Sequence, residues 1–310
     1  MKKYVKKIVC IPFIVVLFTL VTSCKNDEKP MQNTEVLAIS NNIKSRVLSQ
    51  DFKDYWYAGE AEITSYELEQ VRYGEIRKGH AVLIYVTEDF LPNAQVKTDN
   101  QSPENISVLK LNAIKKFITG IYPYSIMQST FYPLSAEQHA LKISSSIQDW
   151  CGQSYTQLNN REKFEISSHS YFEGEADKNF KLKKSILENE LWTQLRIDPK
   201  KLPTGNLEII PSFEFISLKH VELKPYQAIT ELTLNSYTIE YPELERTLTI
   251  NFNNTSPFEI ISWSETVKSG FGNNAKPLTT KATKLITIKS PYWSKNKNKD
   301  SILRETLKLK

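Results

Sequence analysis

The stretch Ala61–Val86, AEITSYELEQVRYGEIRKGHAVLIYV, decides the fold. In its first half apolar residues recur at every second position, as at Tyr66 and Leu68, and a period of two indicates a β-strand. The phase of this alternation slips along the segment, which is typical of bulges that bend a strand. Arg77-Lys78-Gly79 is interpreted as a turn, and the apolar run Ala81–Val86 as a strand buried on both faces.

Similar alternation continues through most of the chain. Strands are expected near residues 109–113, 121–132, 138–158, 162–173, 213–215, 232–241, 248–252, 258–264 and 282–289. Long, bent antiparallel ribbons with few helices indicate an α+β fold that is predominantly antiparallel β. We expect a curved open sheet or a half-barrel, similar in outline to the lipid-holding half-barrels of periplasmic lipoprotein carriers.

Two longer helices are expected in this β-rich fold. Apolar residues keep a helical spacing over Val36–Trp56, which predicts an N-terminal helix. Ser185-Ile186-Leu187-Glu188 is interpreted as a capping box that opens a helix near 185–197, and Pro199 ends it. This second helix either crosses between two sheets or plugs one curved sheet. Residues 36–310 are therefore one β-rich domain, either undivided or made of two similar halves, about 55–180 and 205–290.

The first residues predict export from the cytoplasm. Four lysines precede an apolar run from Ile8 to Val21, which would form a helix about 21 Å long. That length is short of the roughly 30 Å hydrocarbon core of a bilayer, so the run is typical of a cleaved signal peptide over residues 1–23.

Thr22-Ser23-Cys24 resembles the lipobox of bacterial lipoproteins. In that class the cysteine sulfur is acylated after the signal peptide is removed, and two or three acyl chains give stable anchoring. The resemblance implies lipidation, such as palmitate, at Cys24 and a flexible tether over residues 24–35. It places the chain in the cell envelope, anchored to the outer membrane on its periplasmic face or at the cell surface.

Composition excludes several classes of function. Removal of residues 1–23 takes four of the 40 basic residues and leaves 36 against 35 acidic ones, a net charge of +1. Such a balance does not favour a nucleic-acid partner. The chain has only nine glycines and no glycine-rich phosphate loop, so no nucleotide cofactor is expected. Of the three cysteines only Cys151 remains after Cys24, and beside Trp150 it is interpreted as a small buried hydrophobic residue.

No assembled catalytic motif is found, and no spacing typical of a metal site. The weak polar candidates are Glu88, which ends a predicted strand, His169, which shares a strand face with Glu165, and Glu173. A histidine beside a carboxylate suits general base catalysis, although surface strands carry the same pattern. The chain is therefore expected to have no resident cofactor or metal, and the expectation leans away from an enzyme.

The most distinctive segment is Ile121–Pro133, which is rich in tyrosine. Tyr122, Tyr124 and Ile126 share one face of the predicted strand. This face either lines an apolar groove for a ligand or forms part of the core.

Trp56–Leu68, Gly120–Ser125 and Ser168–Glu175 resemble a family of uncharacterised Bacteroidota-type lipoproteins. Some members are labelled "septum formation inhibitor Maf". True Maf proteins are cytoplasmic nucleotide pyrophosphatases with an S-x-S-x-R-R-like segment, which this chain lacks, so the label does not fit. The resemblance implies no activity and assigns no catalytic residues.

The sequence leaves three functions open. The leading hypothesis is a non-catalytic envelope lipoprotein that is held at the membrane by Cys24 and binds an apolar ligand or an envelope protein. The alternatives are an envelope hydrolase that acts on glycan or peptide, and a purely structural surface lipoprotein. The sequence identifies neither the ligand nor the oligomeric state.

Overall fold

The computed structural model describes residues 46–135 and 138–309. Residues Ile43–Lys310 form one compact unit that contains every described element. The predicted signal peptide, Cys24, the tether and the first part of the expected N-terminal helix lie outside the described residues.

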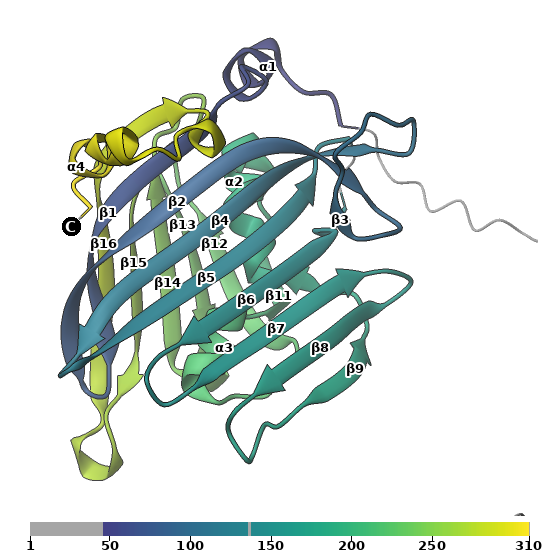
Figure 1. Cartoon of the computed structure of the whole chain (residues 1–310). Coiled ribbons are helices and arrows are strands. Elements are labelled where there is room, and N and C mark those ends of the chain that lie inside the picture. The colour runs from purple at the N-terminus through teal and green to yellow at the C-terminus, as the bar shows by residue number, and fades with distance from the viewer. Residues whose placement is uncertain (1–45, 136–137, 310) are drawn as a thin grey trace, which may run out of the picture. The chain divides into compact units, whose positions relative to one another are not determined.

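The described residues form one 16-stranded sheet with a few short helices (Figure 1). The strands are β1 (Ala61–Arg72), β2 (Glu75–Leu91), β3 (Val96–Lys97), β4 (Ile106–Thr119), β5 (Tyr122–Pro133), β6 (Lys142–Gln148), β7 (Gln153–Asn160), β8 (Phe164–Ser170), β9 (Lys178–Leu182), β10 (Ile186–Leu187), β11 (Gly205–Ile210), β12 (Tyr226–Leu232), β13 (Ser236–Tyr241), β14 (Arg246–Phe252), β15 (Ile260–Ser269) and β16 (Lys276–Ser290). The α-helices are α1 (Gln50–Trp56), α2 (Glu188–Ile197), α3 (Phe213–Lys219) and α4 (Ile302–Thr306). The short pairing of β10 with β11 is parallel, and the sheet is otherwise antiparallel. The expected α+β, predominantly antiparallel fold is confirmed.

The order of the strands explains why the sheet curves. It runs from β10 through β16 to β1 and then on to β9, so the last strands of the chain pair with the first. The two edge strands, β9 and β10, are separated by only three residues, 183–185, which span at most about 14 Å. Opposite edges of the sheet therefore lie close together. They share a hydrophobic cluster in which Phe180 and Leu182 pack with Leu187 and Ile210.

Helices α2 and α3 lie within the curve of the sheet (Figure 1). Leu191 and Leu195 of α2 are buried in the main core together with residues from β1, β2, β4, β5 and β11–β15. Of the two positions left open for the helix near 185–197, the structure shows it packed inside one curved sheet. Its start differs from the expectation: Ser185 donates to the Glu208 carbonyl at the sheet edge, and Glu190 accepts the N–H of Leu187 at the first helical turn.

The phase slips of the first strand have two sources. Ala61 and Ile63 are buried on the outer face, where Leu307 of the C-terminal segment covers them, whereas Tyr66 and Leu68 are buried on the inner face. The pairing of β1 with β16 also shifts register between Ser65 and Tyr66, which is a local irregularity of the predicted kind.

Two local predictions were wrong. The chain turns at Tyr73 and Gly74, which both have positive φ, and not at Arg77-Lys78-Gly79, which lies inside β2. A two-residue loop with positive φ at both residues has a backbone twist that matches the twist of the two strands it joins. Phe213 and Phe215 belong to helix α3 and not to a strand, because Ser212 caps the helix by accepting the N–H of Phe215.

Gly79 is required by the close approach of β2 to β4. A Cβ atom at this position would overlap the Lys116 carbonyl oxygen and lie 2.8 Å from the Phe117 Cβ. We expect Gly79→Ala to lower the free energy of unfolding by about 1–3 kcal/mol, because backbone must move to admit the methyl group. The matched control is Gly174→Ala, where nothing lies within 4 Å of the added Cβ. Urea unfolding measures both, and equal stability of the two variants would contradict the packing described here.

Candidate functional site

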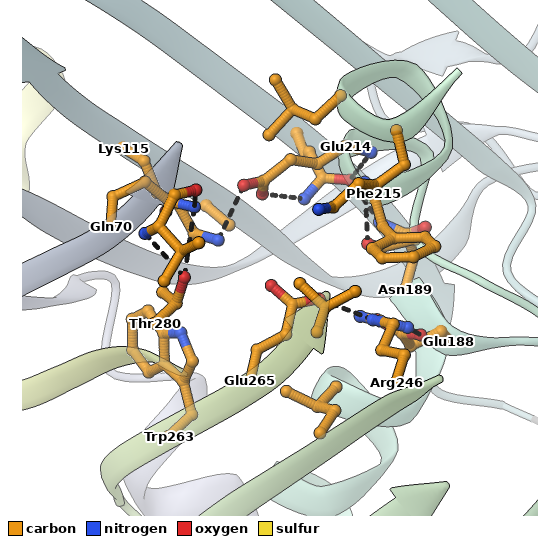
Figure 2. A pocket seen from close by; sticks show the side chains of 18 of the residues that line it. Gln70, Lys115, Glu188, Asn189, Glu214, Phe215, Arg246, Trp263, Glu265 and Thr280 are labelled. Carbon is orange, nitrogen blue, oxygen red and sulfur yellow. Dashed lines mark hydrogen bonds and ion pairs between the residues drawn. The ribbon is translucent and has the colours of Figure 1, made fainter. Parts of the chain in front are cut away.

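The interior of the curved sheet contains a cavity of about 80 Å³ (Figure 2). Its walls come from inward-facing residues of β1, β2, β4, β5 and β14–β16 and from helices α2 and α3. The apolar part of the lining includes Leu83, Leu111, Trp192, Phe215, Leu248 and Trp263. Strands from the N-terminal and C-terminal parts of the chain thus form one site.

The alternation of the strands aims these side chains inward. On β4, Leu111, Ala113 and Lys115 follow one another at every second position, and all three line the cavity. On β5, Gln128 and Thr130 do the same. Period-two spacing therefore places both apolar and polar side chains in the interior.

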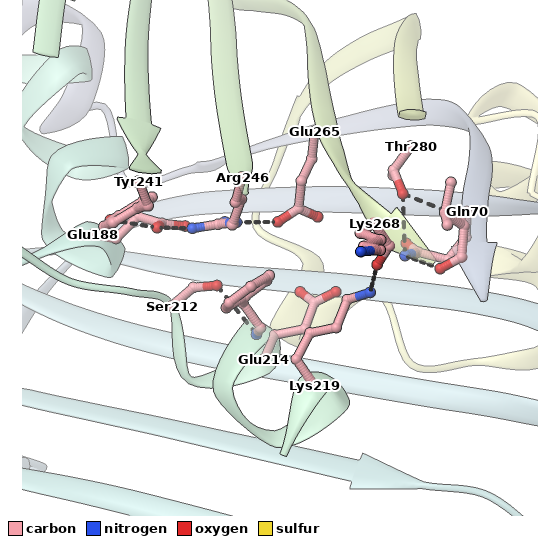
Figure 3. A network of polar contacts seen from close by, with 12 residues as sticks. Gln70, Glu188, Ser212, Glu214, Lys219, Tyr241, Arg246, Glu265, Lys268 and Thr280 are labelled. Carbon is pink, nitrogen blue, oxygen red and sulfur yellow. Dashed lines mark hydrogen bonds and ion pairs between the residues drawn. The ribbon is translucent and has the colours of Figure 1, made fainter. Parts of the chain in front are cut away.

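A chain of buried charges crosses one wall of the cavity (Figure 3). Arg246 forms a two-point ion pair with Glu188 at the start of α2, with Nη2 and Oε1 2.8 Å apart, and also pairs with Glu265 through Nε. The Tyr241 hydroxyl donates to Glu188 at 2.8 Å. Burial would lower the pKa of Arg246, but Glu188 and Glu265 outweigh it and raise this pKa well above its ordinary value. Arg246 therefore stays charged and fixes α2 to β14 and β15.

A second polar cluster attaches α3 to the sheet. Lys115 Nζ lies 2.8 Å from Glu214 Oε1, and Gln128 donates to Glu214 Oε2 at 3.1 Å. Gln128 in turn accepts from Asn189 of α2 at 2.9 Å. These contacts satisfy the charges and amides of this wall within the protein.

The cavity opens where β1, β15 and α3 end, at Arg72, Tyr73 and Lys219, which we call the mouth. Arg72 donates to the Leu218 carbonyl at 2.7 Å and to the Tyr124 hydroxyl, and Lys219 donates to the Lys268 carbonyl at 2.9 Å. Within the described part of the chain, neither cation has a carboxylate oxygen within 4.0 Å. Burial lowers the pKa of Lys219, and the attraction of Glu265 does not offset it.

The charged lining as a whole has an excess of one positive charge. Four cations, Arg72, Lys115, Lys219 and Arg246, face three carboxylates, Glu188, Glu214 and Glu265. The three carboxylates are paired with Lys115 and Arg246, which leaves this wall with a net charge of −1, and the mouth with Arg72 and Lys219 has +2.

The structure places the tyrosine-rich face beside this site. Tyr124 and Ile126 are buried in the core, and Tyr122 packs against it. Gln128 and Thr130, the next two residues on the same face of β5, line the cavity. Tyr124 contacts the mouth through its hydroxyl, which accepts from Arg72 and lies 2.8 Å from the Tyr73 hydroxyl.

The three weak polar candidates are not brought together. Glu88 pairs with Lys110 at 3.2 Å on the outer face of β2, His169 is exposed on β8 and pairs with Asp177, and Glu173 is exposed in the following turn. Five strand-to-strand steps separate β2 from β8 in the sheet, on the order of 20 Å. They do not form one catalytic centre.

A different histidine is paired with a buried carboxylate. His139 Nδ1 lies 2.9 Å from Glu190 Oε1, beside a second cavity that Arg46 and Tyr132 also line. Glu190 accepts further bonds from the N–H groups of Ala140 and Leu187, so the carboxylate closes the start of α2. No nucleophile is hydrogen-bonded to His139 in the described contacts, and the pair is explained by this structural role.

The interpretation of Cys151 was wrong. It is an exposed free thiol in the turn between β6 and β7, where Asp149 accepts its N–H at 2.6 Å. A turn that closes a hairpin in this way leaves its side chains outside the core.

The described residues contain neither a cluster of metal ligands nor a helix suited to span a membrane. No group of three histidine, cysteine or acidic residues in residues 46–135 and 138–309 is arranged to hold a metal ion. None of the described helices is long and apolar enough to cross a membrane.

No family model matches the chain, and no curated protein matches it. Among solved structures, it is similar to a β-barrel-like protein of the domain of unknown function DUF1849 from Brucella abortus. That match has 6% identity and a TM-score of 0.36 and covers 74% of this chain and 98% of the other. A porin-like protein from Bacteroides uniformis matches with 11% identity and a TM-score of 0.21, covering 73% of this chain and 95% of the other. The chain is thus distantly similar to barrel-like β-proteins, and no family is assigned by these matches.

Proposed function

We propose that this chain is a non-catalytic binding protein that holds a small amphipathic ligand in the cavity inside its curved sheet. The observation that carries the proposal is the cavity itself, in which apolar walls from both parts of the chain meet a mouth with two cations that form no ion pair with a carboxylate of the described residues. Pockets of this composition, apolar with a few placed polar groups, are typical of ligand sites.

The size and charge of the cavity define the ligand class. About 80 Å³ is well below the roughly 300–1,000 Å³ of pockets that enclose drug-sized ligands. A short apolar tail fits this volume, and a long acyl chain would have to extend beyond it. The excess positive charge at Arg72 and Lys219 favours a single anionic head group, such as a carboxylate.

The site of action is proposed from the sequence. Cleavage before Cys24 and acylation of its sulfur would tether this binding domain to the envelope, as the resemblance to Bacteroidota-type lipoproteins implies. A chain that starts at Lys25 keeps the whole compact unit from Ile43 onward and lacks the acylated residue. This form suits binding experiments in which no acyl chain of the protein takes part.

A matched series of probes tests the ligand class. Hexanoate, 1-hexanol and hexylammonium share one tail and differ in the charge of the head group. We expect hexanoate to bind most tightly, and replacement of both mouth cations, Arg72→Met with Lys219→Met, to weaken hexanoate about tenfold or more, because each charged hydrogen bond contributes about 1.5–3 kcal/mol. Binding of 1-hexanol should change less than twofold. Tryptophan fluorescence reports the titrations, since Trp192 and Trp263 line the cavity.

The control removes the same charge elsewhere. Lys116 and Lys276 are exposed and do not line the cavity, so Lys116→Met with Lys276→Met should leave hexanoate binding unchanged. Equal affinity for hexanoate and hexylammonium would refute the anionic ligand. Failure of all three probes to bind would refute ligand binding in this cavity.

A further inference from the structure

Exposed apolar side chains gather on the turns around the mouth. They lie at the tips of the hairpins β1–β2, β4–β5, β6–β7, β8–β9 and β15–β16, which occupy the lower part of the sheet in Figure 1, opposite α1 and α4. We call this set the aromatic rim: Tyr73, Ile121, Trp150, Tyr171, Phe172 and Phe271. Antiparallel pairing brings the tips together, because each of these hairpins closes at the end of the sheet where β1 ends.

Ring contacts connect the rim on one side of the mouth. The rings of Tyr73 and Phe271 stack with their centroids 6.2 Å apart. The Tyr73 hydroxyl is hydrogen-bonded to the Tyr124 hydroxyl. The ring centroids of Tyr124 and Tyr122 are 6.0 Å apart, and those of Tyr122 and Trp150 are 6.5 Å apart. The tyrosine-rich segment of the sequence thus links two tips of the rim.

The rim continues past Trp150 to the turn between β8 and β9. Gly152 admits the Tyr171 ring, because a Cβ at this glycine would lie 2.7 Å from the Tyr171 Cγ. Tyr171 contacts Phe172, which packs edge-on against His220 at the end of α3 with centroids 4.9 Å apart. Lys219 of the mouth lies on the same helix, so this part of the rim borders the mouth.

Three side chains at the tips are mostly exposed to solvent. Ile121 is 80% exposed, Phe271 75% and Trp150 67%. Large apolar side chains that share one end of a molecule mark an interaction surface, whereas single exposed ones do not. No stability gain of the fold explains them, because they are not buried in it.

We propose that the aromatic rim docks onto a lipid surface, so that the mouth of the cavity faces the lipid head groups. Tryptophan and tyrosine are the residues that prefer the interface of a bilayer, where their apolar and polar parts are both satisfied. The rim presents its side chains on the tips of separate turns, and a deformable lipid surface accepts such projections without a matching groove. Arg72 and Lys219 at the mouth complement anionic head groups.

The chain outside the described residues has the length that this orientation needs. From Cys24 to Arg46, where the described part begins, 22 residue steps reach up to about 75 Å. The 12 residues of β1 span about 40 Å from the α1 end of the sheet to the mouth. Anchoring at Cys24, which is part of the proposed function, therefore permits the rim to touch the same bilayer, and an amphipathic ligand would exchange directly with it.

Co-flotation with vesicles tests the docking surface. The chain from Lys25 is mixed with vesicles of three parts phosphatidylcholine to one part phosphatidylglycerol, so that no acyl chain of its own contributes to binding. We expect it to float with the vesicles. The triple variant Ile121→Ser, Trp150→Ser and Phe271→Ser should lower its partition coefficient at least tenfold, and thermal unfolding should show that the exposed replacements leave the fold intact.

A matched control removes three exposed apolar residues at the opposite end of the sheet. Val47→Ser, Leu234→Ser and Ile302→Ser replace side chains that are 92%, 72% and 57% exposed, and this variant should float like the unchanged chain. Equal losses in both triple variants, or no flotation of the unchanged chain, would overturn the proposal; a protein partner crosslinked at the rim in place of lipid would do so too. Hexanoate binding is measured on the same variants and on the unchanged chain. An unchanged chain that binds hexanoate but does not float contradicts lipid docking alone, whereas loss of hexanoate binding concerns the cavity.

Discussion

Replacing Arg196 with methionine is expected to lower the free energy of unfolding by about 3–5 kcal/mol, the cost of leaving one partner of a buried ion pair unpaired. Arg196, on α2, donates through both Nη atoms to the two carboxylate oxygens of Glu62 on β1, each at 2.6 Å. The guanidinium lies over the rings of Trp56 and Tyr85, at 5.0 and 4.6 Å from their centroids. Both charged side chains are only 1% exposed. Among the described residues no other cation forms an ion pair with Glu62.

The state of Glu62 explains the size of the effect. Burial would raise the pKa of Glu62, but the charge and hydrogen bonds of Arg196 outweigh burial and hold this pKa below its ordinary value. The pair is therefore ionised. In the Arg196→Met variant the buried charge of Glu62 has lost its partner, and this lowers the free energy of unfolding. The double variant Glu62→Leu with Arg196→Met removes both charges and should recover most of the loss. Urea unfolding measures the series, and a single variant within about 1 kcal/mol of the unchanged chain would contradict the role of this pair in holding α2.

Filling the cavity is expected to abolish ligand binding. Ala113 faces inward on β4 between Leu111 and Lys115, and all three line the cavity. Ala113→Phe adds a ring where only about 80 Å³ is free, so hexanoate affinity should fall by more than tenfold. Some overpacking, about 1–3 kcal/mol of stability, is expected with it.

The control places the same ring on the opposite face of the same strand. Lys116 is exposed, and Lys116→Phe adds no volume to the cavity. Its hexanoate affinity should equal that of the unchanged chain. If the two phenylalanine variants bind hexanoate equally well, the ligand does not occupy this cavity.

The sequence predicts the strands well because burial follows a period of two. It predicts the path of the sheet less well, because pairing of β1 with β16 joins residues more than 200 positions apart and leaves no local signal. Gly79 was mistaken for a turn residue, since the close approach of β4 that excludes its side chain appears only in the folded chain. Phe213 and Phe215 fit a strand as well as one turn of helix, and the cap by Ser212 decides between them.

The residues of the cavity were missed in the sequence, although a signal for them exists. Arg246 stands two positions before Leu248 and four before Ile250, on the same face of the strand. Glu265 likewise stands two positions after Trp263. Arg72 continues the phase of Leu68 in the same way. A charged residue at a position that the alternation assigns to the core must be paired or must serve a site. Glu88, His169 and Glu173 are each close in sequence to another charged residue, but all three lie outside the cavity: Glu88 on the outer face of β2, His169 on β8 and Glu173 in an exposed turn.

The most direct test of the central claim is native mass spectrometry of the chain from Lys25, purified gently after export to the envelope, with extraction of any bound small molecule. We predict one amphipathic acid per chain, displaced by excess hexanoate and absent from the Ala113→Phe variant. A chain of unliganded mass that stays unliganded when hexanoate is added, or a passenger that the Ala113→Phe variant retains in full, would contradict the account.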